Sequence, residues 1–228
     1  MQRIRIVPCL AALLASAGAA LAQAPPPAPP PLTPTPRPVT RIASPLGHTS
    51  VEVGGKFVTS DKPGVPPSYT GGKWIDITYY RPIKRDRSDL FGAGADYGKK
   101  LNASAPVWRA GANVTTRLKT EVPLEIGGKR LEPGEYSLFV DLKENAWTLI
   151  VSTQPWQKNY DANDKTGTWG SYGYDSKYDL ARVPMKVVKT DRALEEFMID
   201  FVDVNDKDGK LALWWDKEFA TADFKILN

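Results

Sequence analysis

The sequence predicts an all-β protein built as a single antiparallel β-sandwich, with jelly-roll and immunoglobulin-like topologies both left open. Three observations predict it. Short runs alternate apolar and polar residues, as in residues 74–80, where Ile75, Ile77 and Tyr79 fall on one face. Glycine and proline turn signals separate these runs, and only residues 191–196 favour a turn of helix. The length of 228 residues suits one domain, because all-β sandwiches reach roughly 250 residues.

Residues 1–22 have the pattern of a secretory signal peptide. Arg3 and Arg5 precede an apolar stretch that ends in small residues, so we expect cleavage after Ala22. A transmembrane anchor is the alternative, but the stretch is shorter than the ~20 residues that a bilayer requires. Cys9 is the only cysteine and leaves with this leader, which excludes disulfides and thiolate chemistry in the mature chain. We therefore expect an exported protein, periplasmic or extracellular.

Residues 23–41 are rich in proline and contain almost nothing that could fill a core. Proline fixes φ and removes backbone donors, so this segment is expected to be an extended polyproline II linker. A spacer between the leader and a folded domain at residues 42–228 is favoured over a peptide ligand for a partner.

The first part of the domain contains two predicted strands. Residues 49–53 form a short strand, and a Gly-Gly turn leads to residues 56–58 as its expected hairpin partner. Residues 74–80 form the second strand, which ends at Arg81-Pro82 because proline cannot donate to a ladder. After a charged loop, the apolar pair Leu90-Phe91 is expected to return to the core.

The centre of the domain carries the strongest turn signals. A strand over residues 114–121 is followed by Gly127-Gly128, a tight hairpin signal, and by Glu132-Pro133-Gly134, a second turn. Residues 136–142 and 147–152 then alternate apolar and polar residues, which predicts a pair of central strands.

The last third begins with a long excursion over residues 154–178, rich in Trp and Tyr and poor in aliphatic residues. Three strands follow, at residues 181–190, 196–204 and 210–216. Residues 219–226 are expected to close the domain as an edge strand.

Four short motifs resemble the DUF2911 family, a group of secreted bacterial proteins without an established function. They are Tyr79-Tyr80-Arg81-Pro82, Leu90-Phe91-Gly92, Val107-Trp108-Arg109-Ala110-Gly111-Ala112-Asn113 and Pro133-Gly134-Glu135-Tyr136-Ser137. The resemblance covers roughly residues 42–226 and implies a β-sandwich in an exported protein, with no activity. Where relatives have Thr and Glu, this chain has Ala110 and Val114, which weakens an enzymatic interpretation.

Arg81, Arg109 and Asn113 form the first candidate site. Each arginine stands beside an aromatic residue and near a glycine or proline. A guanidinium at a strand end either ties down loop carbonyls and carboxylates or presents a fork to an anionic or sugar ligand, with the Asn113 amide beside it. The sequence leaves both roles open.

Trp156, Trp169 and Tyr172 of the excursion form the second candidate site. Aromatic rings interleaved with Asp, Asn and Lys are typical of surfaces that stack on sugar rings. The structural alternative is that the rings cover one end of the sandwich, since Trp and Tyr bury large areas while keeping a polar group in contact with water.

The sequence predicts no metal and no cofactor. His48 is the only histidine, and the Asp- and Asn-rich segments at residues 161–167 and 203–209 fail the spacing of a calcium loop, so both are expected to be plain turns. The formal net charge of +4 falls to +2 without Arg3 and Arg5, which gives no argument for nucleic-acid binding.

These observations favour a noncatalytic, exported or envelope-associated binding module for a glycan or an anionic small ligand. One alternative is a hydrolase of glycan or another envelope polymer, acting through carboxylates that the sequence does not single out. Another is a structural protein that binds an envelope partner through the edge strand at residues 219–226.

Overall fold

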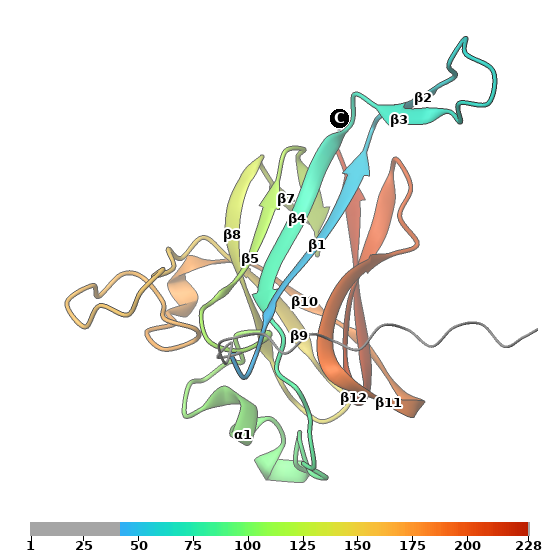
Figure 1. Ribbon diagram of the computed structural model, residues 1–228. Coiled ribbons are helices and arrows are strands. Elements are labelled where there is room, and N and C mark those ends of the chain that lie inside the picture. Colours follow the sequence, from blue (N-terminus) through green and yellow to red (C-terminus); the bar gives the residue numbers. More distant parts are fainter. Residues whose placement is uncertain (1–41, 228) are drawn as a thin grey trace, which may run out of the picture. The chain divides into compact units, whose positions relative to one another are not determined.

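The computed structural model describes residues 42–227, in which two antiparallel sheets pack face to face (Figure 1). The chain is an all-β sandwich, as the sequence predicts. The predicted leader and linker, residues 1–22 and 23–41, lie outside the described part. Within it, no helix is both long enough and apolar enough to cross a membrane.

The larger sheet has six strands in the spatial order β1-β4-β5-β8-β9-β10. They are β1 (Leu46–Val53), β4 (Lys73–Tyr80), β5 (Thr116–Thr120), β8 (Gly134–Asp141), β9 (Thr148–Ser152) and β10 (Asp179–Pro184). The predicted pairing of the two central strands is confirmed, with Leu138 opposite Val151 and Val140 opposite Leu149.

The smaller sheet has four strands in the order β11-β12-β6-β7. They are β11 (Lys186–Val202), β12 (Asp208–Ile226), β6 (Leu124–Ile126) and β7 (Lys129–Leu131). The predicted Gly127-Gly128 hairpin joins β6 to β7, and its φ angles of 58° and 71° are those of a tight turn that only glycine adopts without strain.

The core lies between the sheets and is formed by alternate residues of each strand. Ile75, Ile77 and Tyr79 of β4 are buried there, as their alternation predicts. Trp108 packs against Phe197 and Trp215 from the other sheet, with ring centroids 4.9 and 6.1 Å away.

The outer face of β8 and β9 is also buried. Phe139 and Ile150 are fully buried there in a second apolar cluster with Val107 and Tyr174. Tyr174 belongs to the predicted excursion, which the structure confirms as a segment without regular strands that extends from the sandwich (Figure 1). The excursion therefore covers one outer face of the larger sheet.

Three short helical turns lie outside the sheets: η1 (Gly94–Asp96), α1 (Lys99–Asn102) and η2 (Ser176–Tyr178). Helix α1 leads into the loop that faces the excursion. Leu90 and Phe91, upstream of η1, are buried in the main core as predicted.

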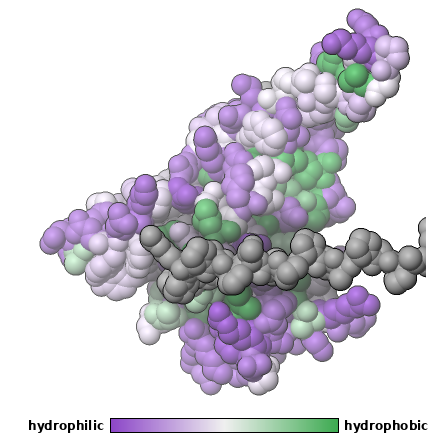
Figure 2. Space-filling view, in the orientation of Figure 1, coloured by the Kyte–Doolittle hydropathy of each residue, from purple (hydrophilic) through white to green (hydrophobic). Residues whose placement is uncertain are grey.

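The predicted pairing of residues 49–53 with residues 56–58 is wrong. Strand β1 pairs with β4, while β2 (Lys56–Val58) pairs with β3 (Ser68–Thr70) in an arm that projects from the sandwich (Figure 1). The chain leaves the sheet at Gly54 and returns at Gly71, with φ angles of 69° and 76° that let the backbone turn sharply at both points. Apolar residues lie exposed on this arm (Figure 2), chiefly Phe57, Val58 and Val65.

The predicted strand over residues 181–190 is divided between the sheets at Met185, where β10 ends and β11 begins. The predicted helical turn at residues 191–196 is wrong, because this segment lies inside β11 and pairs with β12 across two register shifts. Good helix formers such as Ala193, Leu194 and Glu195 favour a helix locally, but the tertiary pairing outweighs that preference.

The prediction that residues 219–226 form an edge strand is also wrong. They continue β12, which pairs with β11 on one side and, at residues Phe224 to Ile226, with β6 on the other. Ala220, Ala222 and Phe224 are buried. The segment therefore belongs to a strand that lies inside the smaller sheet rather than at its edge.

Candidate functional site

The loop that carries Arg109 is fixed by the residue before it. Trp108 is 1% exposed, exchanges two backbone hydrogen bonds with Val140 of β8, and donates its indole N–H to the carbonyl of Gly111. With Trp108 held in the core, Arg109 projects away from it. Ala110 follows with a φ of 47°, and its carbonyl accepts a hydrogen bond from the Thr116 hydroxyl.

The excursion is held to the sheet by buried polar side chains. Thr115, directly before β5, donates to the carbonyl of Gly170 at 2.7 Å. Gln154 donates to the carbonyls of Thr166 and Gly173 and accepts from the backbone of Asp175. These bonds replace regular strand pairing, so the excursion has a defined conformation.

Three aromatic side chains gather on the outside of the excursion. The Tyr160 ring lies 6.4 Å from the Trp169 ring and 6.2 Å from the Tyr172 ring, centroid to centroid. Trp169 and Tyr172 exchange backbone hydrogen bonds across a tight turn. Tyr160 is 54% and Tyr172 69% exposed, and we call these three residues the aromatic platform.

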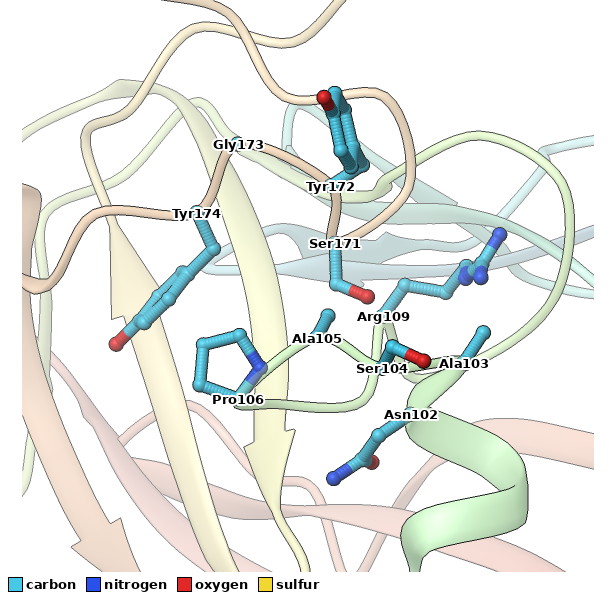
Figure 3. Close-up of a pocket in the computed structure, with 10 residues that line it drawn as sticks. All are labelled: Asn102, Ala103, Ser104, Ala105, Pro106, Arg109, Ser171, Tyr172, Gly173 and Tyr174. Atoms are coloured by element: carbon cyan, nitrogen blue, oxygen red, sulfur yellow. The ribbon is translucent and has the colours of Figure 1, made fainter.

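A cavity of about 340 Å³ lies beside the platform, between the excursion and the loop after α1 (Figure 3). We call it the Arg109 cavity. Among the described residues, those that line it include one charged side chain, Arg109, and no carboxylate. The lining residues are Asn102, Ala103, Ser104, Ala105, Pro106, Arg109, Ser171, Tyr172, Gly173 and Tyr174. Figure 3 shows the Ser171 hydroxyl directed from the excursion toward Arg109 and the facing loop.

Arg109 has no carboxylate partner among residues 42–227. Its Nη1 donates to the carbonyl of Asn113 at 2.8 Å, and it belongs to none of the ion pairs there. Burial lowers the pKa of the Arg109 guanidinium, and no carboxylate of the described chain raises it again. An arginine nevertheless keeps its charge. Residues 1–41 contain no Asp or Glu that could neutralise it.

Two residues that border this cavity each have a buried side-chain atom without a hydrogen-bond partner in the described chain. These atoms are Oγ of Ser171, a residue 1% exposed, and Oδ1 of Asn102. A buried polar group left without a partner costs about 1–3 kcal/mol. Among the described residues, the lining of the Arg109 cavity therefore includes an arginine without a carboxylate partner, a serine with an unused hydroxyl and an asparagine with an unused acceptor.

A second cavity, of about 400 Å³, lies on the other side of Tyr172, and Tyr160 and Lys165 also border it. Asp161 and Asp164 contribute its carboxylates. Asp164 accepts hydrogen bonds from the backbone of Gly167 and Thr166, which lower the pKa of its carboxyl. These local bonds hold residues 164–167 in a turn.

The predicted site residues separate into two groups. Arg109, Trp169 and Tyr172 lie together at the platform and the cavity, and Asn113 contacts Arg109 through its backbone carbonyl rather than its side-chain amide. Trp156 lies elsewhere, with its ring 3.9 Å from the guanidinium carbon of Arg117.

Arg81 links the end of β4 to β11 through a partly exposed ion pair. Its Nη1 lies 3.0 Å from Oε2 of Glu196 on β11, and its backbone N–H donates to the carbonyl of Pro45. It borders neither of the two cavities beside the platform. The sequence leaves a structural role and a ligand-binding role open for Arg81. This geometry favours the structural role.

His48 lies near a serine and a carboxylate on the outer face of β1 and β4. Ser50 donates to Oδ1 of Asp76 at 2.7 Å, and Nε2 of His48 is 3.3 Å from the same oxygen. In a catalytic triad the histidine stands between the other two residues. Here the serine proton goes to the carboxylate, and Ser50 Oγ is 3.4 Å from both ring nitrogens, so the histidine is not aligned to accept it.

The described residues contain no group of three His, Cys, Asp or Glu side chains placed to hold a metal ion. Among carboxyls, burial raises the pKa of Glu218, which lies 3.6 Å from Lys189 on β11. Glu218 borders neither cavity beside the platform.

Sequence reasoning did not single out Ser171, Asn102 or Tyr160. Ser171 stands in the run Trp169-Gly170-Ser171-Tyr172-Gly173-Tyr174, where glycines between aromatic residues signal tight turns. Asn102 carries no such signal. Its importance depends on the cavity, which forms between segments far apart in the sequence.

No curated protein and no solved structure matches this chain. One family does: residues 66–224 match the family described as "Protein of unknown function (DUF2911)". The matched segment runs from the end of the arm loop through most of β12 and includes both Arg109 and the aromatic platform. It covers more than half of the chain and confirms the resemblance that the short motifs indicate. The chain therefore belongs to the DUF2911 family.

Proposed function

We propose that this protein is a noncatalytic, exported carbohydrate-binding module whose ligand lies on the aromatic platform. The observation that carries the proposal is the platform itself. The exposed rings of Tyr160 and Tyr172 meet edge to face, with ring planes 63° apart, beside Trp169 on a segment fixed by buried hydrogen bonds.

Such a surface suits a sugar better than an apolar partner. Tyr and Trp offer large, rigid contact areas at a low cost in side-chain entropy, together with a polar group. The two cavities on either side of Tyr172 add hydrogen-bonding groups, which orient a ligand. The excursion around the platform is mainly hydrophilic in Figure 2, unlike an obligate protein interface.

The noncatalytic part of the proposal rests on the carboxylates. Glycoside hydrolysis requires one acid with a raised pKa and a second carboxylate across the bond. The Arg109 cavity contains no carboxylate, and in the cavity bordered by Tyr160 the pKa of Asp164 is lowered by its turn. The one carboxyl of the described chain with a raised pKa, Glu218, lies at neither cavity.

Export is the part of the proposal that the sequence supports. A basic start, an apolar stretch and small residues at the exit precede a proline-rich linker. Fractionation of cells that express the full chain tests it, because an exported protein loses the leader and leaves the cytoplasm.

Affinity electrophoresis tests the binding function. The purified protein is run through gels containing one polysaccharide each, both neutral and acidic. We expect at least one polysaccharide to retard the wild type, and the double variant Tyr160→Ala/Tyr172→Ala to run as in a gel without polysaccharide.

Phe57→Ala is the matched control, because Phe57 is a 75% exposed aromatic residue on the arm, away from the excursion (Figure 1). It should be retarded like the wild type. Equal retardation of the double variant and the wild type, or no retardation of the wild type in any gel, would contradict the proposal.

A further inference from the structure

We infer that the Arg109 cavity is a subsite for the carboxylate of an acidic sugar, a uronic acid residue whose ring lies on the aromatic platform. This inference rests on the proposed function, because the platform is what brings a sugar to the cavity. It goes beyond that function by naming the class of ligand.

The first support is the charge of Arg109. Arg109 borders the cavity and has no carboxylate partner in residues 42–227, and burial lowers the pKa of its guanidinium. A partly buried cation without a carboxylate partner favours an anion, and the planar fork of arginine matches the two oxygens of a carboxylate.

The second support is independent of charge. Ser171 is 1% exposed and borders the cavity, and its Oγ has no hydrogen-bond partner in the described chain. Figure 3 shows this hydroxyl directed toward Arg109. A hydroxyl placed beside an arginine supplies a neutral donor for the same anion.

The third support selects a carboxylate over a sulfate or phosphate ester. Asn102 also belongs to the lining, and its Oδ1 is an acceptor without a donor in the described chain. It would oppose the additional terminal oxygen of a sulfate or phosphate group. It would accept from a sugar hydroxyl, such as the one on C4 of the unit at the non-reducing end of trigalacturonate.

The position of the cavity agrees with this ligand. Tyr172 and Gly173 border both the Arg109 cavity and the cavity on the Tyr160 side. A sugar ring on the platform can therefore direct a substituent into the Arg109 cavity while the rest of the chain continues along the excursion.

Titration calorimetry with matched oligosaccharides tests the inference. The probes are trigalacturonate, its neutral counterpart galactotriose, and the same neutral trisaccharide carrying a sulfate ester. We expect the purified wild type to bind trigalacturonate about tenfold or more tightly than galactotriose, and more tightly than the sulfated sugar.

Two variants test which residues cause the preference for trigalacturonate over galactotriose. Arg109→Gln should bind trigalacturonate and galactotriose about equally, and Ser171→Ala should lose severalfold of the preference without losing the Asn113 contact of Arg109. Arg192→Gln removes an exposed arginine of β11 as a control for net charge, and it should keep the wild-type preference. If Arg109→Gln does not fold, Ser171→Ala alone decides the question.

The outcomes separate the inference from the proposed function. Binding of galactotriose that depends on Tyr172, without any preference for trigalacturonate, overturns the inference and keeps the proposed function. A preference for the sulfated sugar, or one that both variants retain, also overturns it. If none of the three sugars binds, the inference fails, and the gel panel decides the proposed function separately.

Discussion

The guanidinium of Arg109 lies directly against Gly170 of the excursion. A Cβ atom at Gly170 would stand 2.7 Å from Nη1 and 2.9 Å from the guanidinium carbon, and the φ angle of Gly170 is +64°. The absence of a side chain at this one position therefore permits both the turn between Trp169 and Tyr172 and the position of Arg109.

Gly170→Ala should reduce both stability and sugar binding. The left-handed backbone costs a non-glycine residue about 1–2 kcal/mol, and the new methyl group displaces the guanidinium. Gly128→Ala is the control, because Gly128 has a φ of +71° but nothing within 4 Å of its Cβ position. Urea unfolding should show a similar or smaller loss for Gly128→Ala, with unchanged binding. Equal binding by both variants would contradict a role for the position of Arg109.

Arg81→Met should affect the fold and not the site. The ion pair of Arg81 and Glu196 spans 3.0 Å, with both side chains 37% exposed, so solvent screening limits it to less than about 1 kcal/mol. We expect a small decrease in melting temperature for Arg81→Met and for Glu196→Gln, with losses that do not add in the double variant. Retardation by polysaccharide should be the same as in the wild type. A loss of retardation would assign Arg81 to the site.

Tyr79→Phe should destabilise the sandwich more than its small change in volume suggests. The Tyr79 hydroxyl of β4 donates to the carbonyl of Ile199 at 3.2 Å and accepts from its N–H at 3.0 Å, which links the two sheets. Loss of both bonds in the core should cost about 1–3 kcal/mol, measured by urea unfolding. Tyr136→Phe removes a hydroxyl that donates to one exposed carbonyl and should cost less. Equal costs would mean that the link contributes little.

Glu218→Gln should change how stability depends on pH. Burial raises the pKa of the Glu218 carboxyl, so the folded protein holds this proton more tightly than the unfolded chain. The resulting stability is present below the ordinary pKa of glutamate, near 4.5, and is lost as pH rises through the raised value.

The variant, which cannot ionise, should therefore be more stable than the wild type at neutral pH, and the difference should shrink on acidification. Thermal unfolding across this pH range measures the effect. Glu125→Gln is the control for the loss of a lysine contact, because Glu125 pairs with Lys225 on the surface. A wild type that is more stable than Glu218→Gln at neutral pH would contradict the prediction.

The sequence predicts those parts of the fold that depend on neighbouring residues. The alternation of Ile75, Ile77 and Tyr79 and the Gly127-Gly128 turn are local signals, and both are confirmed. The partner of a strand is not local. Nothing within residues 49–58 indicates that β1 pairs with β4 rather than β2, and nothing in residues 219–226 indicates that β6, far earlier in the chain, lies beside them.

The same limit applies to the site. The density of aromatic residues in the excursion identifies Trp169 and Tyr172, but Arg81 and Arg109 look alike in sequence. Only the three-dimensional position of Glu196 distinguishes them, since it neutralises Arg81 while Arg109 has no such partner in the described chain. Ser171 becomes significant only once the fold removes its hydroxyl from water without providing a partner.

The most direct test of the whole account is the ¹⁵N–¹H spectrum of the tryptophan indoles, recorded as trigalacturonate is added to the purified protein. Trp169 belongs to the platform, while Trp74 is a 43% exposed residue of β4. We predict that the Trp169 signal, assigned with Trp169→Phe, shifts progressively while the Trp74 signal stays in place, and that Arg109→Gln weakens the shift. An unmoved Trp169 signal at saturating sugar, or an equal shift of Trp74, would contradict a sugar site on the excursion.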